Sequence, residues 1–375
     1  MNNLKLRIAA LLMAAISTVV LAQTPDSIDW NRARDLYQRS QRGEQLTPDD
    51  QAYLERAKVA HAAMEAGKNP GGQPANPNPG KTETGMVPLT DLTAKYNGED
   101  GGLYGAGRNE PPAELAASAK AETQKIQPLN AEGKPAPDGK IVLLSIGMSN
   151  TTMEFSRFAQ LASQSPEKSP SLVIVDGAQG GQTAEKIAVE TVPFWSIIGQ
   201  RLKAAGVTPE QVEVIWLKEA NAQPKTGFPD AAQHLKNSII EDIAIARKFY
   251  PNLRIVYLSS RIYAGYANTL LNPEPYAYEG AFAVRWVIQE QMKPGSNLLK
   301  EAAAKRGIQP PIVLWGPYLW ADGLKGRKGD DLVWKHEDFG GDGTHPSETG
   351  REKVAALLLK FFKSDPNACL WFLKK

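Results

Sequence analysis

From Lys140 to the C-terminus, short apolar runs alternate with longer segments in which apolar residues recur every three or four positions. Short runs of this kind are typical of strands buried in a parallel sheet, and the periodic segments are typical of amphipathic helices. The runs that we predict as strands are residues 141–146, 172–175, 212–217, 253–258 and 312–315. Such an alternation predicts an α/β fold, a three-layer αβα sandwich around a doubly wound, mostly parallel five-stranded sheet.

The segments between and after these runs carry the helical patterns. We predict helices over residues 112–125, 231–249, 281–292 and 351–363. In the last of these, Val354, Leu358 and Phe361 share one face with further apolar residues, so that face is expected to pack on the sheet.

The N-terminal part of the chain has a different organisation. Two short amphipathic patterns, the second opened by Thr47-Pro48-Asp49, predict a small helical hairpin within residues 23–67. Residues 68–85 are rich in proline and glycine and are predicted to be a linker. Residues 86–375 then form the main domain, with the irregular residues 86–139 packed on it.

The first 22 residues have the pattern of a secretory signal peptide. Lys5 and Arg7 precede a short apolar run, and small residues lead to Ala22, after which we predict cleavage. The alternative, a membrane anchor, is disfavoured because a spanning helix needs about 20 apolar residues. We therefore expect a secreted or periplasmic protein with no stable membrane anchor after cleavage.

Charge and cysteine content exclude further classes. The formal net charge of +2 equals the charge of Lys5 and Arg7, so the rest of the chain is neutral. A neutral chain is not typical of a nucleic-acid binder. Cys369 is the single cysteine, which excludes an internal disulfide, and its apolar neighbours indicate a packing role.

The ends of the predicted strands carry the candidate chemistry, because ligands of open α/β sheets bind beyond the carboxyl ends of the strands. Ser149 follows the strand 141–146 at the start of a predicted helix. It is either a nucleophile or a helix-capping serine. Asp342 and His345 lie on a turn before the last helix, where the carboxylate can orient one imidazole nitrogen and leave the other free as a base.

Other readings of the same strand ends remain open. Asp342 with His345 also fits a capping carboxylate beside a surface histidine, or a metal pair, although no recognised ligand spacing is present. Gly181 precedes a short helix whose free N–H groups suit an oxyanion or a phosphate, but no G-x-G-x-x-G motif is found. Asn221, after the strand 212–217, is either an amide donor or a turn residue.

These segments together resemble the SGNH (GDSL-like) hydrolase superfamily, named for blocks that carry Ser, Gly, Asn and His. The matching segments are Gly147-Met148-Ser149-Asn150, Gly180-Gly181, Trp216 to Ala222, and Asp342 to His345. They are most similar to the carbohydrate and sialate O-acetylesterase branch, whose first and third blocks read G-Q-S-N-M and W-x-Q-G-E-S-N-A. Met148 and Lys218 depart from that pattern.

The resemblance implies a flavodoxin-like SGNH fold and a secreted serine esterase that acts on small acyl groups, with acetyl esters of a carbohydrate expected. It implies neither a metal nor another cofactor, and its partner is an acylated carbohydrate or another small ester. The implied roles are nucleophile for Ser149, base for His345, orienting acid for Asp342, oxyanion donors for Ser149, Gly181 and Asn221, and substrate contacts for Asn150 and Glu219. Alternatives are an inactive carbohydrate-binding protein on this scaffold and an acyltransferase using the same triad.

Four aromatic residues lie between the last strand and the histidine turn. They are Trp315, Tyr318, Trp320 and Trp334. Flat aromatic rings stack on sugars in carbohydrate sites, but they equally well fill a core.

Overall fold

The computed structural model describes residues 28–41, 44, 46–47, 49–50, 53–54, 57, 82–295 and 297–374. The predicted signal peptide over residues 1–22, its cleavage after Ala22, and residues 68–81 of the predicted linker lie outside the described residues. The chain divides into two compact units, one that ends at Pro70 and one that begins at Gly71.

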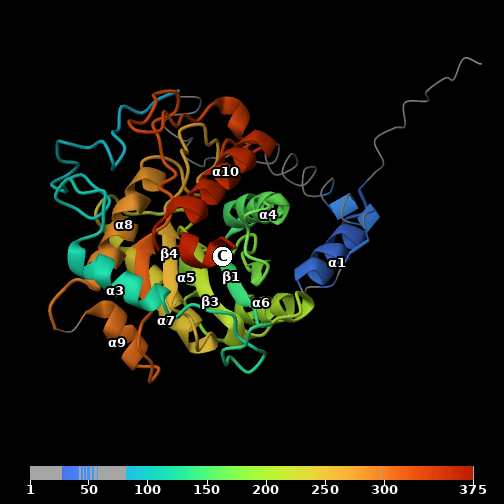
Figure 1. Ribbon diagram of the computed structural model, residues 1–375. Helices are drawn as coiled ribbons and strands as arrows, with labels where there is room; N and C mark the ends of the chain where they lie inside the picture. Colours follow the sequence, from blue (N-terminus) through green and yellow to red (C-terminus); the bar gives the residue numbers. More distant parts are fainter. Residues whose placement is uncertain are drawn as a thin grey trace, which may run out of the picture. The chain divides into compact units, whose positions relative to one another are not determined.

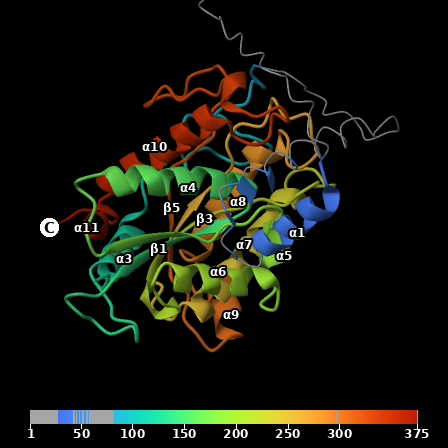
Figure 2. The same ribbon diagram turned by 90° about the vertical axis from the view of Figure 1, so that its right-hand side faces the viewer.

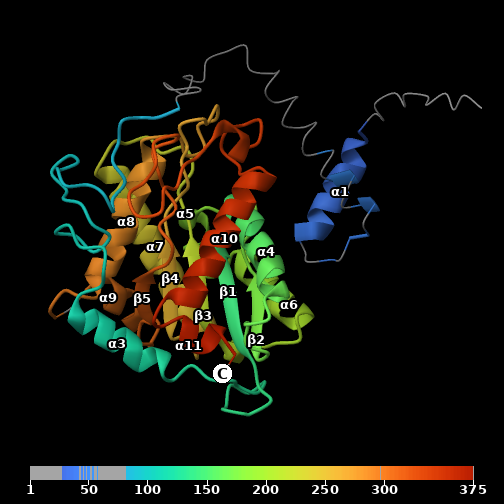
Figure 3. The same cartoon turned by 45° about the horizontal axis from the view of Figure 1, so that its top comes forward.

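A five-stranded parallel sheet forms the centre of the second unit. Its strands are β1 (Ile141–Gly147), β2 (Leu172–Asp176), β3 (Val212–Lys218), β4 (Ile255–Ser259) and β5 (Ile312–Trp315). They lie side by side in the order β2-β1-β3-β4-β5, as Figure 3 shows. From β1 the chain first adds β2 on one side and then β3, β4 and β5 on the other. The switch point of the topology therefore lies between β1 and β3, and a site is expected at the carboxyl ends of these two strands.

Helices cover both faces of this sheet, so the predicted three-layer αβα fold is confirmed. The α-helices of this unit are α3 (Ala113–Thr123), α4 (Ser149–Gln164), α5 (Ala184–Ile187), α6 (Pro193–Ala204), α7 (Asp230–Phe249), α8 (Tyr276–Glu290), α9 (Leu298–Ala304), α10 (Glu348–Ser364) and α11 (Cys369–Phe372). Two short 3-10 helices cover Pro209–Gln211 and His336–Asp338. Helices α4 and α10 pack beside each other (Figure 1), and α6, α7 and α9 lie across the sheet from them (Figure 2).

The burial of the strands explains their composition. Strands β1, β3 and β4 are buried along their whole length, as expected for strands with helices on both faces.

Helix α8 begins at Tyr276, before the predicted start at residue 281. The sequence pattern is interrupted by Gly280, a poor helix former, but packing overrides that preference. Gly280 packs against α7, where a Cβ would lie 3.7 Å from Leu235 Cδ2, an ordinary van der Waals contact.

Residues 86–139 contribute to the same core despite their irregular backbone. Leu89 and Tyr104 are buried in it, together with Leu115 of α3. The backbone is fixed by side chains at and just after the end of β5. Tyr318 Oη accepts from the Leu89 N–H at 3.1 Å. The indole N–H of Trp315 donates to the Leu103 carbonyl at 2.6 Å.

The N-terminal unit contains helix α1 (Trp30–Gln41) and further helical residues that fall in the second predicted helix. Its buried side chains form a small cluster of their own, made of Ala33, Leu36, Leu46, Tyr53, Leu54 and Ala57. Among the helices of the described ranges, none is both long and apolar enough to cross a membrane.

The buried carboxyl of Glu213 in β3 is expected to make the free energy of unfolding depend on pH. Its side chain is buried, and burial raises the pKa of this carboxyl to about 8, although a hydrogen bond from the Gln127 N–H and the charge of Arg254 lower it. An unfolded glutamate ionises near its ordinary pKa of 4.5. Between these values the unfolded state binds fewer protons, so this group lowers the stability as the pH rises from about 4.5 to about 8.

Glu213→Gln removes this titration and is expected to raise Tm relative to the wild type by an amount that grows from pH 5 to pH 8. Thermal unfolding followed by circular dichroism at several pH values measures the effect. Glu132→Gln, at an exposed position, is the control for the loss of one carboxylate. A difference between Glu213→Gln and the wild type that stays constant with pH would contradict the assignment.

Candidate active site

Ser149 lies where β1 passes into α4. Gly147 at the end of β1 is closely packed, since a Cβ there would lie 2.4 Å from Thr151 Oγ1 and 2.5 Å from the Lys218 carbonyl oxygen. Met148 occupies the extended N-cap position, so Ser149 is the first residue of α4. No side-chain capping bond is made at the start of this helix, and Ser149 Oγ instead contacts His345 Nε2 at 2.7 Å.

The structure brings Ser149, His345 and Asp342 into one chain of hydrogen bonds. On the far side of the imidazole, His345 Nδ1 lies 2.5 Å from Asp342 Oδ2. The other carboxylate oxygen, Asp342 Oδ1, accepts from the backbone N–H groups of Thr344 and His345, each at 3.0 Å. The His345 and Asp342 side chains are 27% and 31% exposed and Ser149 is half-buried, so the site is partly open to solvent.

The charge of Asp342 determines which ring nitrogen of neutral His345 carries the proton. Burial raises the pKa of this carboxyl, but hydrogen bonds from the side chain and backbone of His345 and from the Thr344 N–H lower it to about 2. Asp342 is therefore ionised at neutral pH and acts only as an acceptor. In neutral His345 the proton is thus assigned to Nδ1, and Nε2 is free to accept the hydroxyl proton of Ser149.

The turn that carries Asp342 and His345 is held by hydrogen bonds from Asn150 of α4 and from Arg261, just after β4. Its Thr344 carbonyl accepts from Asn150 Nδ2 at 2.9 Å and from Arg261 Nη2 at 3.4 Å. Asn150 is 1% exposed and follows Ser149 directly, so the start of α4 and the histidine turn are held by neighbouring residues. These bonds maintain the distance between hydroxyl and imidazole.

Residues 260–275, which join β4 to α8, hold the same turn from the side; we call them the β4–α8 loop. Within it, Asn268 Nδ2 donates to the Gly341 carbonyl at 2.9 Å, and the hydroxyls of Thr269 and Thr344 are 2.9 Å apart. Farther along, Asn272 Nδ2 donates to the Asn221 carbonyl at 3.1 Å. Sequence reasoning missed this loop, although a long connection without periodicity is itself a sign of a functional segment.

Gly343 makes the close approach of this loop possible. Its φ is +61°, and a Cβ there would lie 1.9 Å from the Tyr266 carbonyl oxygen. A residue other than glycine would displace either the loop or the histidine turn.

The two glycines after β2 lie beside the serine. A Cβ on Gly180 would be 3.9 Å from Ser149 Cβ, and the Gln179 N–H donates to the Gly147 carbonyl at 2.9 Å. Gly181 has a φ of +74°, a left-handed conformation that favours glycine. The loop before α5 therefore passes next to the start of α4.

Asn221 lies at the end of β3 and is tied to α5. Its Oδ1 accepts from the Glu185 N–H at 3.0 Å, and the Ala220 carbonyl accepts from the Ala184 N–H at 3.3 Å. Because the amide oxygen is bound to a backbone donor, the amide nitrogen points the other way, where His234 Nδ1 lies 3.5 Å from it. The ends of β1, β2 and β3 and the histidine turn thus converge, as the sequence predicted for strand ends.

Asn150 and Glu219 are placed differently from the substrate contacts implied by the resemblance. Both are buried, at 1% and 2% exposure. Asn150 is engaged with Thr344, and Glu219 Oε2 accepts from the Ala220 N–H at 3.2 Å. Burial raises the pKa of Glu219 well above its usual range. Both side chains support the surrounding turns, and their role as substrate contacts stays a prediction.

Lys218 forms an ion pair under the site that the sequence did not reveal. Its Nζ lies 2.6 Å from Glu154 Oε2, and the two side chains are 1% and 0% exposed. Burial lowers the pKa of Lys218 and raises that of Glu154, while their mutual attraction acts against both shifts. The Lys218 carbonyl also accepts from Thr151 Oγ1 at 2.6 Å, which joins β3 to the first turn of α4.

The four aromatic residues before the histidine turn fill the core. Trp320 and Trp334 are 0% exposed, and Trp315 and Tyr318 are 5% exposed. Of the two interpretations of these residues, packing is therefore the one that the structure supports.

No protein-family model and no curated protein sequence matches this chain. Among solved structures it is similar to the salicylyl-acyltransferase SsfX3 from a tetracycline biosynthetic pathway, at 15% identity and a TM-score of 0.32, over 62% of this chain and 56% of that one. It is also similar to the periplasmic domain of the lipopolysaccharide acetyltransferase of Salmonella ser. Paratyphi A, at 11% identity and a TM-score of 0.32, over 66% and 96% of the two chains. A third similar structure is LAE5, an alpha/beta hydrolase enzyme from the metagenome of Lake Arreo, at 13% identity and a TM-score of 0.31, over 63% and 99%.

Proposed function

We propose that this chain is a secreted or periplasmic serine esterase of the SGNH type that hydrolyses small acyl esters, foremost acetyl esters of a carbohydrate. The observation that carries the proposal is the contact of Ser149 Oγ with His345 Nε2 at 2.7 Å. The other ring nitrogen of the same histidine, Nδ1, contacts Asp342. A serine, a base and an orienting carboxylate in this order are what nucleophilic ester hydrolysis requires.

In the first half of the reaction, Ser149 Oγ attacks the ester carbonyl while His345 Nε2 takes the hydroxyl proton. The imidazolium formed is stabilised by the ionised Asp342 carboxylate. When the tetrahedral intermediate collapses, the bond to the alcohol oxygen breaks, and that oxygen takes the proton from His345. The acyl group remains on Ser149.

In the second half, water attacks the acyl-serine carbonyl while His345 Nε2 takes a proton from the water. The bond to Ser149 Oγ then breaks, Ser149 Oγ takes that proton back, and the carboxylic acid leaves. Each tetrahedral intermediate carries a negative oxygen, for which we assign the N–H groups of Ser149 and Gly181 and the side-chain amide of Asn221. Ser149 is the first residue of α4, where backbone N–H groups have no partner within the helix. The Glu185 N–H fixes Oδ1 of Asn221, and its amide nitrogen, 3.5 Å from His234 Nδ1, would exchange that contact for the oxyanion.

Small acyl groups are favoured by the surroundings of Ser149. Gly180 and His345 lie against Ser149, and the turn of His345 contacts the β4–α8 loop through polar side chains, which we take to favour a short acyl group over a long apolar one. A methylene contributes about 0.8 kcal/mol only when it is buried against apolar groups. Longer chains should therefore gain little binding and lose favourable orientation.

We expect kcat/KM for p-nitrophenyl esters to fall at least about tenfold from acetate to octanoate, measured by release of p-nitrophenol. A rate that rises with chain length would contradict the assignment and indicate a lipid esterase. The acyltransferase alternative is measured in the same assay by adding methyl glucoside. Acetylated glycoside formed faster than free acetate would favour transfer over hydrolysis.

A further inference from the structure

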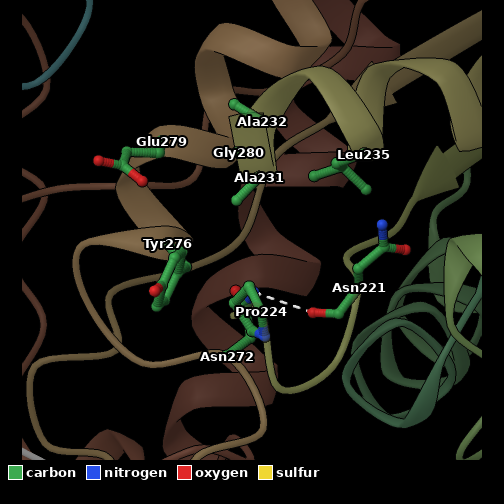
Figure 4. A pocket seen from close by; sticks show the side chains of 9 residues that line it. All are labelled: Asn221, Pro224, Ala231, Ala232, Leu235, Asn272, Tyr276, Glu279 and Gly280. Atoms are coloured by element: carbon green, nitrogen blue, oxygen red, sulfur yellow. Dashed lines mark hydrogen bonds between the residues drawn. The ribbon is translucent and has the colours of Figure 1, made fainter. Parts of the chain in front are cut away.

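A small pocket lies next to Asn221, outside the triad. It has a volume of about 20 Å³ and is formed by the loop after β3, the first turns of α7 and α8, and the end of the β4–α8 loop. Its lining residues are Asn221, Pro224, Ala231, Ala232, Leu235, Asn272, Tyr276, Glu279 and Gly280, which Figure 4 shows from close by.

The polar group of interest in this pocket is the Asn272 side chain. It is 5% exposed, and its Nδ2 is used in the bond to the Asn221 carbonyl. Its Oδ1 is buried and accepts no hydrogen bond from the described part of the chain. A buried acceptor without a donor is costly, so this atom is suited to a group that brings a donor with it.

The size of the pocket limits that group. Roughly 10–15 Å³ of such volume is needed for one water molecule, so about 20 Å³ accommodates a single hydroxyl or a group of similar size. An acetyl group has no hydrogen to donate to Asn272 Oδ1, whereas an alcohol with several hydroxyl groups has.

We propose that this pocket binds one hydroxyl group of the alcohol part of the ester and so selects esters of sugars and other polyols. The proposal rests on the proposed function, because it assigns the alcohol side of the same reaction. Asn221 connects the two sites, since its side chain is assigned to the oxyanion and its carbonyl is held by Asn272. The β4–α8 loop also connects them, because Thr269 contacts Thr344 of the histidine turn and Asn272, three residues later, lines the pocket.

The test fills the pocket without removing a hydrogen bond. Ala231→Leu introduces a bulky side chain at a half-buried lining position of α7, and Ala116→Leu makes the same change at a half-buried position of α3 outside the pocket. The substrates are monoacetylated methyl glucosides, galactosides and xylosides, with p-nitrophenyl acetate as reference. The measured quantity is kcat/KM for each glycoside acetate divided by kcat/KM for p-nitrophenyl acetate.

We expect this ratio to fall at least about tenfold in Ala231→Leu for the best glycoside acetate and to change less than about twofold in Ala116→Leu. In the wild type, monodeoxy versions of that substrate should identify one hydroxyl whose loss lowers kcat/KM by about tenfold or more. This second measurement needs no variant, so a folding defect of Ala231→Leu does not prevent the test.

Two results would overturn the proposal. One is an equal ratio in both variants and the wild type, and the other is a deoxy series in which every substrate reacts like its parent, as expected if the pocket holds only water. Either result leaves hydrolysis of p-nitrophenyl acetate intact, so it is distinguishable from failure of the proposed function, in which no ester hydrolysis depends on Ser149.

Discussion

Ser149→Ala is expected to lower kcat for p-nitrophenyl acetate by about 10⁶-fold, because a serine triad without its nucleophile retains only the contributions of binding and oxyanion stabilisation. The expected loss follows from the position of the Ser149 hydroxyl. Ser149 Oγ is the atom that contacts His345 Nε2 at 2.7 Å, and alanine leaves that imidazole without a hydroxyl to deprotonate. Release of p-nitrophenol by purified wild type and variant measures the change.

The matched control is Ser163→Ala, an exposed serine near the other end of the same helix, whose hydroxyl donates to the Gln160 carbonyl of its own helix. A fluorophosphonate probe adds an independent measurement, since it reacts with activated serines. We expect it to label the wild type and Ser163→Ala but not Ser149→Ala. An undiminished rate in Ser149→Ala would refute the assignment, and an unlabelled wild type would favour the inactive, carbohydrate-binding alternative.

The fold and the meeting of the candidate residues were predictable from the sequence for one physical reason. Apolar runs mark the buried strands, and the carboxyl ends of parallel strands face the same edge of a sheet. Ser149 after β1 and Asn221 after β3 therefore had to lie at one edge. Asp342 and His345 are close in the chain, so a tight turn was enough to place them together.

Contacts between distant residues of irregular segments were not predictable in this way. The β4–α8 loop has no periodicity, so nothing in its sequence places Asn268 and Asn272 against the histidine turn and Asn221. Burial of a polar residue is equally hidden, so nothing in the sequence indicated that Asn150 and Glu219, implied by the resemblance as substrate contacts, are buried. Lys218 stood out only as a departure from the pattern of the family that the sequence resembles.

The partner of Lys218 leads to a second large effect. Lys218→Met leaves the Glu154 carboxylate buried at 0% exposure without its ion-pair partner, and such a change costs about 3–5 kcal/mol of unfolding free energy. Replacing both residues, as in Lys218→Met with Glu154→Leu, removes the buried charges together and is expected to restore most of that stability. Urea unfolding followed by tryptophan fluorescence measures the free energies. The control is Lys125→Met, which breaks a pair whose lysine is 52% exposed and should cost less than about 1 kcal/mol.

The double variant also distinguishes the contribution of the Lys218 side-chain charge from that of the Lys218 backbone carbonyl. The first turn of α4 is bound through the Lys218 carbonyl, which accepts from Thr151 Oγ1 and is unaffected by a change of side chain. We therefore expect the double variant to retain kcat for p-nitrophenyl acetate within about tenfold of the wild type. A double variant that is stable but has lost activity would show instead that the buried charges act on the triad. A single variant no less stable than Lys125→Met would show that Glu154 is neutral in the folded protein, since an uncharged carboxyl needs no counterion.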